Sequence, residues 1–108
     1  MPKPDSFYHK VNQVVKQIPY GKVTTYGLIA EHIGSKGSAR MVGWVLNKQK
    51  GNPEIPAHRV VNRKGLLTGK MHFEGSNLMQ DLLESEGIKV VDNQIVDMNE
   101  CLWVPGDK

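Results

Sequence analysis

Cysteine, long apolar runs and clustered metal ligands are all scarce in this chain of 108 residues. The single cysteine, Cys101, cannot form an internal disulfide, which fits a reducing cytoplasm. No apolar run approaches the ~18–20 residues that span a bilayer, and the first ten residues lack the apolar stretch of a secretion signal. The four histidines lie far apart, none at metal-ligand spacing. We therefore expect a cytoplasmic protein without a metal, another cofactor or membrane contact.

Acidic residues are scarce over residues 1–72, which carry twelve lysines and arginines but three acids, a net charge of +9. Residues 73–108 carry two lysines and eight acids, a net charge of −6. This polarity favours a basic face that binds a polyanion such as a nucleic acid, although small domains also carry uneven charge by chance. The length predicts one domain over residues 1–108 with a single core, and we expect a monomer.

The basic part of the chain carries apolar residues at the spacing of helices. The predicted helices cover residues 6–18, residues 26–33 and about residues 39–49. Their predicted caps are, in order, Asp5 or Ser6, Thr25, and Ser38. Gly34 should end the second helix. The short glycine turn before the third helix matches a helix-turn-helix unit, but any αα-hairpin in a small bundle has a similar length and turn.

The rest of the chain is predicted to hold one more helix and short extended segments. Val60-Val61 and Leu66-Leu67 form either a hairpin or two separate extended pieces. Residues 89–91 and 95–97 form a hairpin. A helix over 77–86 points four side chains inward: Leu78, Met79, Leu82 and Leu83. The predicted fold class is mainly α with short β hairpins, arranged as a single winged helix-turn-helix-like domain.

The predicted third helix carries two residues that suit contact with another molecule. Gly43 lies mid-helix, where glycine costs about 1 kcal/mol relative to alanine. A position without a side chain lets a second backbone approach closely, whether protein or nucleic acid. Arg40, at the start of the helix, can contact a phosphate, insert between bases or remain a solvated charge. The residues alone leave these alternatives open.

A histidine–arginine pair stands in the segment Pro56-Ala57-His58-Arg59-Val60. His58 has the chemistry of a general base, but no nucleophile stands beside it in the sequence. The residues alone therefore favour a structural role for His58.

The same segment resembles the PCHRV motif of the O6-alkylguanine-DNA alkyltransferases, with alanine at the cysteine position. Three further segments match motifs of that family in the same order. Residues 23–30 resemble V-x-[ST]-Y-G-x-[IL]-A, residues 38–43 resemble the A-R-x-V-G recognition helix, and residues 83–87 resemble L-x-x-E-G. The resemblance covers nearly the whole chain, from about Phe7 to Pro105. With alanine in place of the acceptor cysteine, the chain is similar to the alkyltransferase-like members of the family.

The resemblance implies that the third helix enters the minor groove of duplex DNA while an O6-alkylguanine is rotated out of the base stack. The small residues Ala39 and Gly43 fit a groove only ~6 Å wide. Trp44 is bulky, and we expect it to lie off the line of contact.

Five positions take base-binding roles from the resemblance. Arg40 fills the gap left by the flipped base, and Tyr26 assists flipping and bonds the extruded guanine. The backbone of Ala57 and Val60 contacts that base. Lys70 stands where the alkyltransferase-like proteins have a lesion-sensing arginine, and lysine keeps the charge but loses the flat, bidentate guanidinium.

Position 57 decides the reaction that the resemblance implies. In the enzymes a thiolate accepts the alkyl group there, assisted by a histidine and a glutamate that His58 and Glu86 match. The methyl side chain of Ala57 cannot act as a nucleophile. The resemblance therefore implies a non-enzymatic protein without catalytic residues, in which Pro56, His58, Arg59 and Glu86 support the pocket.

Duplex DNA containing O6-alkylguanine is thus the expected partner, and binding would place the protein on the nucleoid. By resemblance, it would flag the lesion for nucleotide excision repair, whose proteins are candidate partners. A winged-helix transcription regulator would explain the basic half but not the segment 56–60. A genuine alkyltransferase with another nucleophile would have to use Cys101, far from that segment in the sequence.

Overall fold

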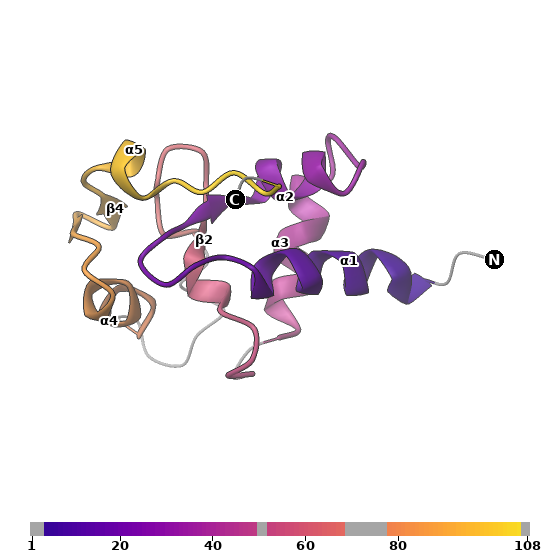
Figure 1. Ribbon diagram of the computed structural model, residues 1–108, viewed down its shortest axis with the longest axis horizontal. Coiled ribbons are helices and arrows are strands. Elements are labelled where there is room, and N and C mark those ends of the chain that lie inside the picture. The colour runs from indigo at the N-terminus through magenta and orange to yellow at the C-terminus, as the bar shows by residue number, and fades with distance from the viewer. Residues whose placement is uncertain (1–3, 50–51, 69–77, 107–108) are drawn as a thin grey trace.

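The computed structural model describes residues 4–49, 52–68 and 78–106. Three helices make up the first half of the chain, in the order α1 (Pro4–Lys16), α2 (Tyr26–His32) and α3 (Ala39–Asn47). A short turn joins α2 to α3, and these two helices pack on each other and on α1 (Figure 1). The predicted helix-turn-helix is confirmed. Within the described ranges, no helix is long and apolar enough to cross a membrane.

The ends of α2 follow the sequence prediction, and the start of α3 follows it in part. Thr25 caps α2, because its Oγ1 accepts a 3.1 Å hydrogen bond from the N–H of Leu28. Gly34 follows α2 with a φ of +81°, a left-handed conformation that suits glycine after a helix. Ser38 precedes α3, but its side chain makes no capping hydrogen bond. Its carbonyl instead accepts a 3.1 Å hydrogen bond from the N–H of Val42.

The predicted start of the first helix is wrong. α1 begins at Pro4, so Asp5 and Ser6 lie inside its first turn and not at its cap. Proline is favoured at the first helical position, because the N–H that it lacks would have no partner there. α3 also ends at Asn47, before the predicted end at residue 49.

The second half of the chain holds short elements. They are η1 (Ala57–Arg59), β2 (Val60–Val61), α4 (Leu78–Ser85), β3 (Val90–Val91), β4 (Gln94–Ile95) and α5 (Met98–Cys101). In α4, Met79 and Leu83 are fully buried as predicted, but Leu78 is 39% exposed and Leu82 is only half-buried. The helix turns a narrow i, i+4 stripe to the core, so the predicted apolar face was too wide. Residue 77, the predicted first residue of this helix, lies outside the described residues.

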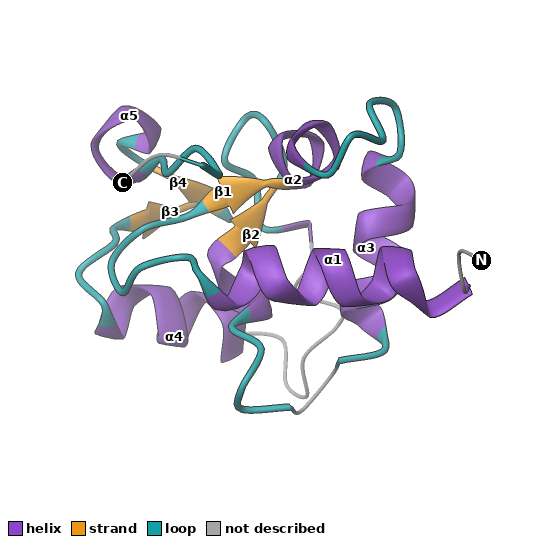
Figure 2. Ribbon diagram, turned by 45° about the vertical axis from the view of Figure 1, so that its right-hand side comes forward, coloured by secondary structure: helices purple, strands orange, loops and turns teal. Residues whose placement is uncertain are grey.

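Two strands from distant parts of the chain pair in parallel at the centre of the molecule. β1 (Thr24–Thr25) lies against β2, with Thr24 opposite Val60 and Thr25 opposite Val61. Figure 2 shows this pair between α2 and α3 on one side and α4, β3 and β4 on the other. Leu66 instead forms an antiparallel bridge with Gln94. Of the two alternatives for the segments 60–61 and 66–67, separate extended pieces is therefore the one that the structure shows.

The predicted hairpin near the end of the chain is confirmed, with a tighter turn. β3 and β4 are antiparallel, with Val90 opposite Ile95 and Val91 opposite Gln94. The turn residues Asp92 and Asn93 have φ values of 51° and 65°. Two positive φ values are what a two-residue hairpin turn needs, so Gln94 belongs to the strand and not to the turn.

Apolar side chains gather in two clusters, where the sequence predicted a single core. The first cluster joins α1, α2 and α3 with Ala57 and Val60. The second joins Val23 and Val61 with α4, the β3–β4 hairpin and Cys101. Successive residues of a strand point to opposite faces, so Val60 and Val61 send their side chains to different clusters. The central strand pair thus divides the core.

Candidate nucleic-acid interface

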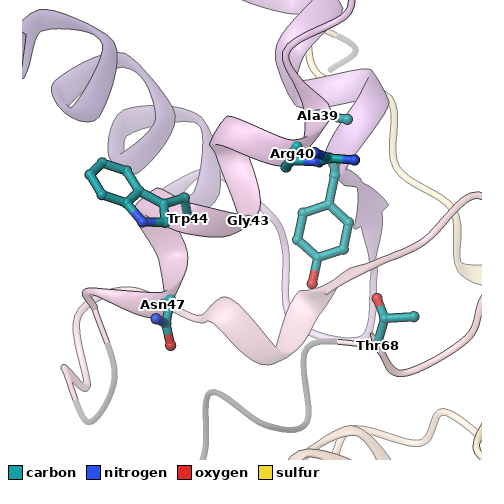
Figure 3. Close-up of a pocket in the computed structure, with 7 residues that line it drawn as sticks. Ala39, Arg40, Gly43, Trp44, Asn47 and Thr68 are labelled. Carbon is teal, nitrogen blue, oxygen red and sulfur yellow. The ribbon is translucent and has the colours of Figure 1, made fainter.

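The outward face of α3 forms one side of an open groove with a volume of about 440 Å³ (Figure 3). Val42, Val45 and Leu46 point inward and are at most 1% exposed. The positions at i, i+3, i+4 and i+7 from Arg40 therefore fall on the opposite face. The described residues that line the groove are Tyr26, Ala39, Arg40, Gly43, Trp44, Asn47 and Thr68.

The packing of the protein does not require glycine at position 43. A Cβ atom built there would lie 3.6 Å from Cε1 of Tyr26, which is an ordinary van der Waals distance. Alanine would therefore fit against Tyr26 and would favour the helix. The missing side chain instead leaves the floor of the groove open. Close approach of an external molecule thus explains Gly43 better than helix packing does.

Tyr26 is the first residue of α2, directly after the capping Thr25. Burial raises the pKa of the Tyr26 hydroxyl, and a hydrogen bond with the Thr68 side chain offsets part of that rise. The hydroxyl therefore stays protonated at neutral pH and remains a hydrogen-bond donor. The structure brings Tyr26 together with Arg40, Ala39 and Gly43 around one groove.

Trp44 lies nearer to Gly43 than the expectation of a residue off the line of DNA contact suggested, although that expectation itself stays a prediction. It lines the groove beside Gly43, and 53% of it is exposed. The Lys48 Nζ atom lies 4.3 Å from the centroid of the Trp44 ring, a cation–π distance. The helical spacing of Trp44 from Arg40 and Asn47 agrees with its place in the groove. Thr68, which comes from a separate part of the chain, has no comparable signal in the sequence.

Ala57 and Val60 both belong to the first apolar cluster. Ala57 begins η1 and is 9% exposed, and Val60 is fully buried in the same cluster. The contact of their backbone with the flipped base, which the resemblance implies, stays a prediction. Pro56 precedes η1, and its carbonyl accepts a 2.9 Å hydrogen bond from the Arg59 N–H. Lys70 lies outside the described residues.

Beneath η1, the carboxylate of Glu86 accepts hydrogen bonds from three residues. Its Oε2 lies 2.6 Å from His58 Nε2 and 2.9 Å from Arg59 Nη2. Its Oε1 lies 3.0 Å from Arg59 Nε and 2.9 Å from the Gly21 nitrogen. The Glu86 side chain is only 5% exposed, so these bonds replace its hydration. Of the four predicted support residues, His58 and Arg59 therefore both bond to the third, Glu86.

Arg59 extends this network to α1. Its Nη1 donates a 2.9 Å hydrogen bond to the carbonyl of Ile18, two residues after the end of α1. Its guanidinium carbon lies 5.8 Å from the centroid of the Tyr20 ring, and the Tyr20 hydroxyl donates to the carbonyl of Ser85. η1 is thereby fixed to the end of α1 and to the end of α4. No residue pattern indicates the backbone partners at Gly21 and Ile18.

The network also determines the charge of its members. Burial alone would raise the pKa of Glu86, but hydrogen bonds from Arg59, His58 and Gly21 bring it below its usual value. Burial lowers the pKa of His58, and the bond to Glu86 offsets only part of that effect. Because Arg59 already balances the Glu86 charge, His58 is neutral at pH 7 and donates from Nε2.

Acid is expected to destabilise the protein in two stages. The pKa values of His58 and Glu86 are both lower in the folded protein than in the unfolded chain. The unfolded chain therefore binds more protons in acid, and the free energy of unfolding decreases as the pH is lowered. The first loss begins below the unfolded pKa of histidine, about 6.5. The second begins below the unfolded pKa of glutamate, about 4.3, and continues as pH falls through the lowered pKa of Glu86. Urea midpoints across this range measure both stages.

His58→Gln is the control for this prediction. Its amide still donates to Glu86 but does not titrate, so the first stage should shrink while the second remains. Equal urea midpoints at neutral and mildly acidic pH in the natural chain would contradict the assignment of a neutral, buried His58.

Comparison with known proteins gives consistent matches along the chain. Residues 6–88 match the family described as 6-O-methylguanine DNA methyltransferase, DNA binding domain. Alkyltransferase-like protein 1 of Schizosaccharomyces pombe is 35% identical over 105 residues, which cover 94% of this chain and 97% of that protein. The DNA base-flipping protein of Escherichia coli is 39% identical over 105 residues, which cover 95% of this chain and 78% of that protein.

The fold matches a solved complex with DNA. The crystal structure of S. pombe Atl1 with damaged DNA containing O6-carboxymethylguanine superimposes with a TM-score of 0.82 at 32% identity. The match covers 96% of this chain and all of that chain.

Proposed function

The chain belongs to the family of the 6-O-methylguanine DNA methyltransferase DNA-binding domain, and from that premise we propose that it recognises O6-alkylguanine without repairing it. It would flip the base out of duplex DNA and leave the alkyl group in place. One observation carries the proposal. Ala57, which the motif resemblance aligns with the acceptor cysteine, directly precedes a histidine that is bonded to a buried glutamate. The supports of the reaction are retained, and the nucleophile is absent.

The position of Cys101 supports the absence of repair. Cys101 is 7% exposed and belongs to the second cluster, whereas Ala57 belongs to the first. Burial raises the pKa of the Cys101 thiol, which keeps it from forming the thiolate that alkyl transfer requires. This environment argues against Cys101 as a substitute acceptor.

The α3 groove suits the recognition step. α3 would enter the minor groove, with Ala39 and Gly43 allowing its backbone to come close to the DNA. Arg40 would occupy the place of the flipped base, where its flat guanidinium stacks and donates to the orphaned partner base. The neutral Tyr26 hydroxyl would donate a hydrogen bond to the extruded nucleotide. A lesion held in this way would then be available to the proteins of nucleotide excision repair.

Binding to matched duplexes tests this proposal. One labelled duplex carries a single O6-methylguanine, and the other carries guanine at the same place. Fluorescence anisotropy should show at least about tenfold tighter binding to the lesion, which corresponds to about 1.4 kcal/mol. Equal affinity for the two duplexes would refute lesion recognition. A footprint at one sequence, independent of alkylation, would instead support a transcription regulator.

Arg40→Ala is expected to weaken binding to the lesion duplex by about 1–3 kcal/mol, because the gap in the stack is then unfilled. Arg40→Lys should recover only part of this affinity, since lysine lacks the flat guanidinium. Lys36→Ala is the matched control, because it removes one exposed positive charge that does not line the groove. It should weaken binding to both duplexes slightly and equally. Full affinity of Arg40→Ala for the lesion would remove Arg40 from the mechanism.

A further inference from the structure

One large side chain in the α3 groove has no part in the recognition steps described above. Trp44 is 53% exposed, and the neighbouring Met41 is 48% exposed. Both side chains thus place apolar surface in water on the outer side of a single helix. Exposed apolar patches on small soluble proteins often mark contact sites. Of the two residues, only Trp44 lines the groove.

Gly43 lies at the floor of the groove, where it has no side chain to fill the space. Figure 3 shows Trp44 and Thr68 on opposite sides of Gly43. Tyr26 lies on the Thr68 side, since it forms a hydrogen bond with the Thr68 side chain. The floor at Gly43 is therefore flanked by two aromatic side chains, one that captures the base and one without an assigned role.

The charge around Trp44 favours a polyanion. The Lys48 Nζ atom lies 4.3 Å from the centroid of the ring, so a positive charge accompanies the indole. Arg40 lines the same groove, and none of the described lining residues is acidic. Between Glu31 and Glu54 the sequence has no aspartate or glutamate. An apolar ring beside a fixed cation is complementary to a deoxyribose beside its phosphate.

We propose that Trp44 packs on the sugars of one strand of duplex DNA while Lys48 neutralises an adjacent phosphate of that strand. The pair would set the depth and register of α3 in the groove before the base is flipped. Trp44 is thus a positioning residue. Sugars and phosphates are the same in damaged and undamaged DNA, so the contact adds affinity without lesion preference. The inference rests on the proposed function only in taking DNA as the occupant of the groove.

Tryptophan fluorescence tests the contact directly. The chain has two tryptophans, Trp44 and the half-buried Trp103, so Trp103→Phe leaves Trp44 as the only tryptophan, which is excited selectively at wavelengths where tyrosine does not absorb. Addition of either duplex should shift its emission to the blue and protect it from acrylamide quenching. In Trp44→Phe, which keeps Trp103 and needs no change in the core, this response should disappear. The inference would be overturned if the emission of Trp44 stayed unchanged while anisotropy showed a saturated complex with DNA. The exposed surface at Trp44 would then be assigned to contact with a protein partner.

Affinity gives a second, independent readout. Trp44→Ala should weaken binding to the lesion and guanine duplexes by the same factor, about tenfold. Lys48→Gln should lower the slope of log K against log salt by about one. Met41→Ala is the matched control, because it removes a similarly exposed apolar side chain that does not line the groove. It should bind like the natural chain.

The outcomes separate this inference from the proposed function. Lesion preference with unchanged Trp44 emission contradicts only the inference. A Trp44 response to both duplexes without lesion preference contradicts only lesion recognition. A loss in Trp44→Ala that is confined to the lesion duplex contradicts the positioning role, because the ring would then touch the flipped base.

Discussion

An Ala57→Cys variant is expected to accept one alkyl group from O6-methylguanine DNA, whereas the natural chain accepts none. Residue 57 begins η1 and directly precedes His58, whose Nε2 lies 2.6 Å from Glu86. The introduced thiol would lose its proton to the His58 side chain, and its sulfur would attack the alkyl carbon. The bond from that carbon to guanine O6 would break, and the guanine would regain a proton. The product is a stable thioether, so each protein would react once.

Radiolabelled methyl groups in a lesion duplex measure this transfer. Label on the Ala57→Cys variant should approach one methyl group per protein molecule. Ala57→Ser is the matched control, since a hydroxyl is a far weaker nucleophile than a thiolate, and it should stay unlabelled. Adding His58→Gln to Ala57→Cys should slow the transfer, because no base then takes the thiol proton. An Ala57→Cys protein that binds the lesion but stays unlabelled would show that residue 57 does not face the alkyl carbon.

Glu86→Ala is expected to destabilise the protein by about 3–5 kcal/mol, the cost of removing one partner of a buried ion pair. The change would leave the Arg59 guanidinium, the His58 ring N–H and the Gly21 N–H without their acceptor. Domains of this kind have a total stability of about 5–15 kcal/mol, so the variant would lose a large part of it. Urea unfolding followed by circular dichroism gives the value.

Two further variants sharpen that measurement. Glu84→Ala removes an exposed carboxylate from the last turn of α4, two residues before Glu86, and should change stability by no more than about 0.5 kcal/mol. Glu86→Gln keeps one oxygen acceptor but places an amide N–H near the Arg59 and His58 donors. Its loss of stability should therefore lie between those of Glu84→Ala and Glu86→Ala. Equal stability of Glu86→Ala and Glu84→Ala would mean that the network does not hold η1 in place.

Local signals in the sequence predicted much of the fold. The Thr25 cap and the Gly34 stop depend on neighbouring residues, so they can be read along the chain. The parallel pairing of β1 with β2 cannot, because strands of two residues carry too little alternation to show a partner. The pairing is set by tertiary packing, which also splits the core into two clusters.

The residues of α3 that line the groove could be predicted from the sequence, since helical spacing puts Arg40, Gly43 and Trp44 on one face. The size of the Trp44 side chain suggested a place off the DNA contact, whereas its spacing placed it in the groove, where the structure has it. Thr68 reaches the groove through tertiary folding alone. Likewise, the Gly21 N–H is a backbone donor to Glu86. Almost every residue type has a backbone N–H, so the sequence does not indicate which one bonds to Glu86.

The central claim is recognition without repair, and the fate of the lesion in a complex with the natural protein tests it most directly. Protein and O6-methylguanine duplex are mixed in equal amounts until binding is complete. The bound DNA is then digested for nucleoside analysis, and the protein is weighed by intact mass spectrometry. The account predicts that the bound DNA still contains all of its O6-methylguanine and that the protein mass is unchanged. Conversion of the lesion to guanine, with a protein heavier by one methyl group, would contradict it.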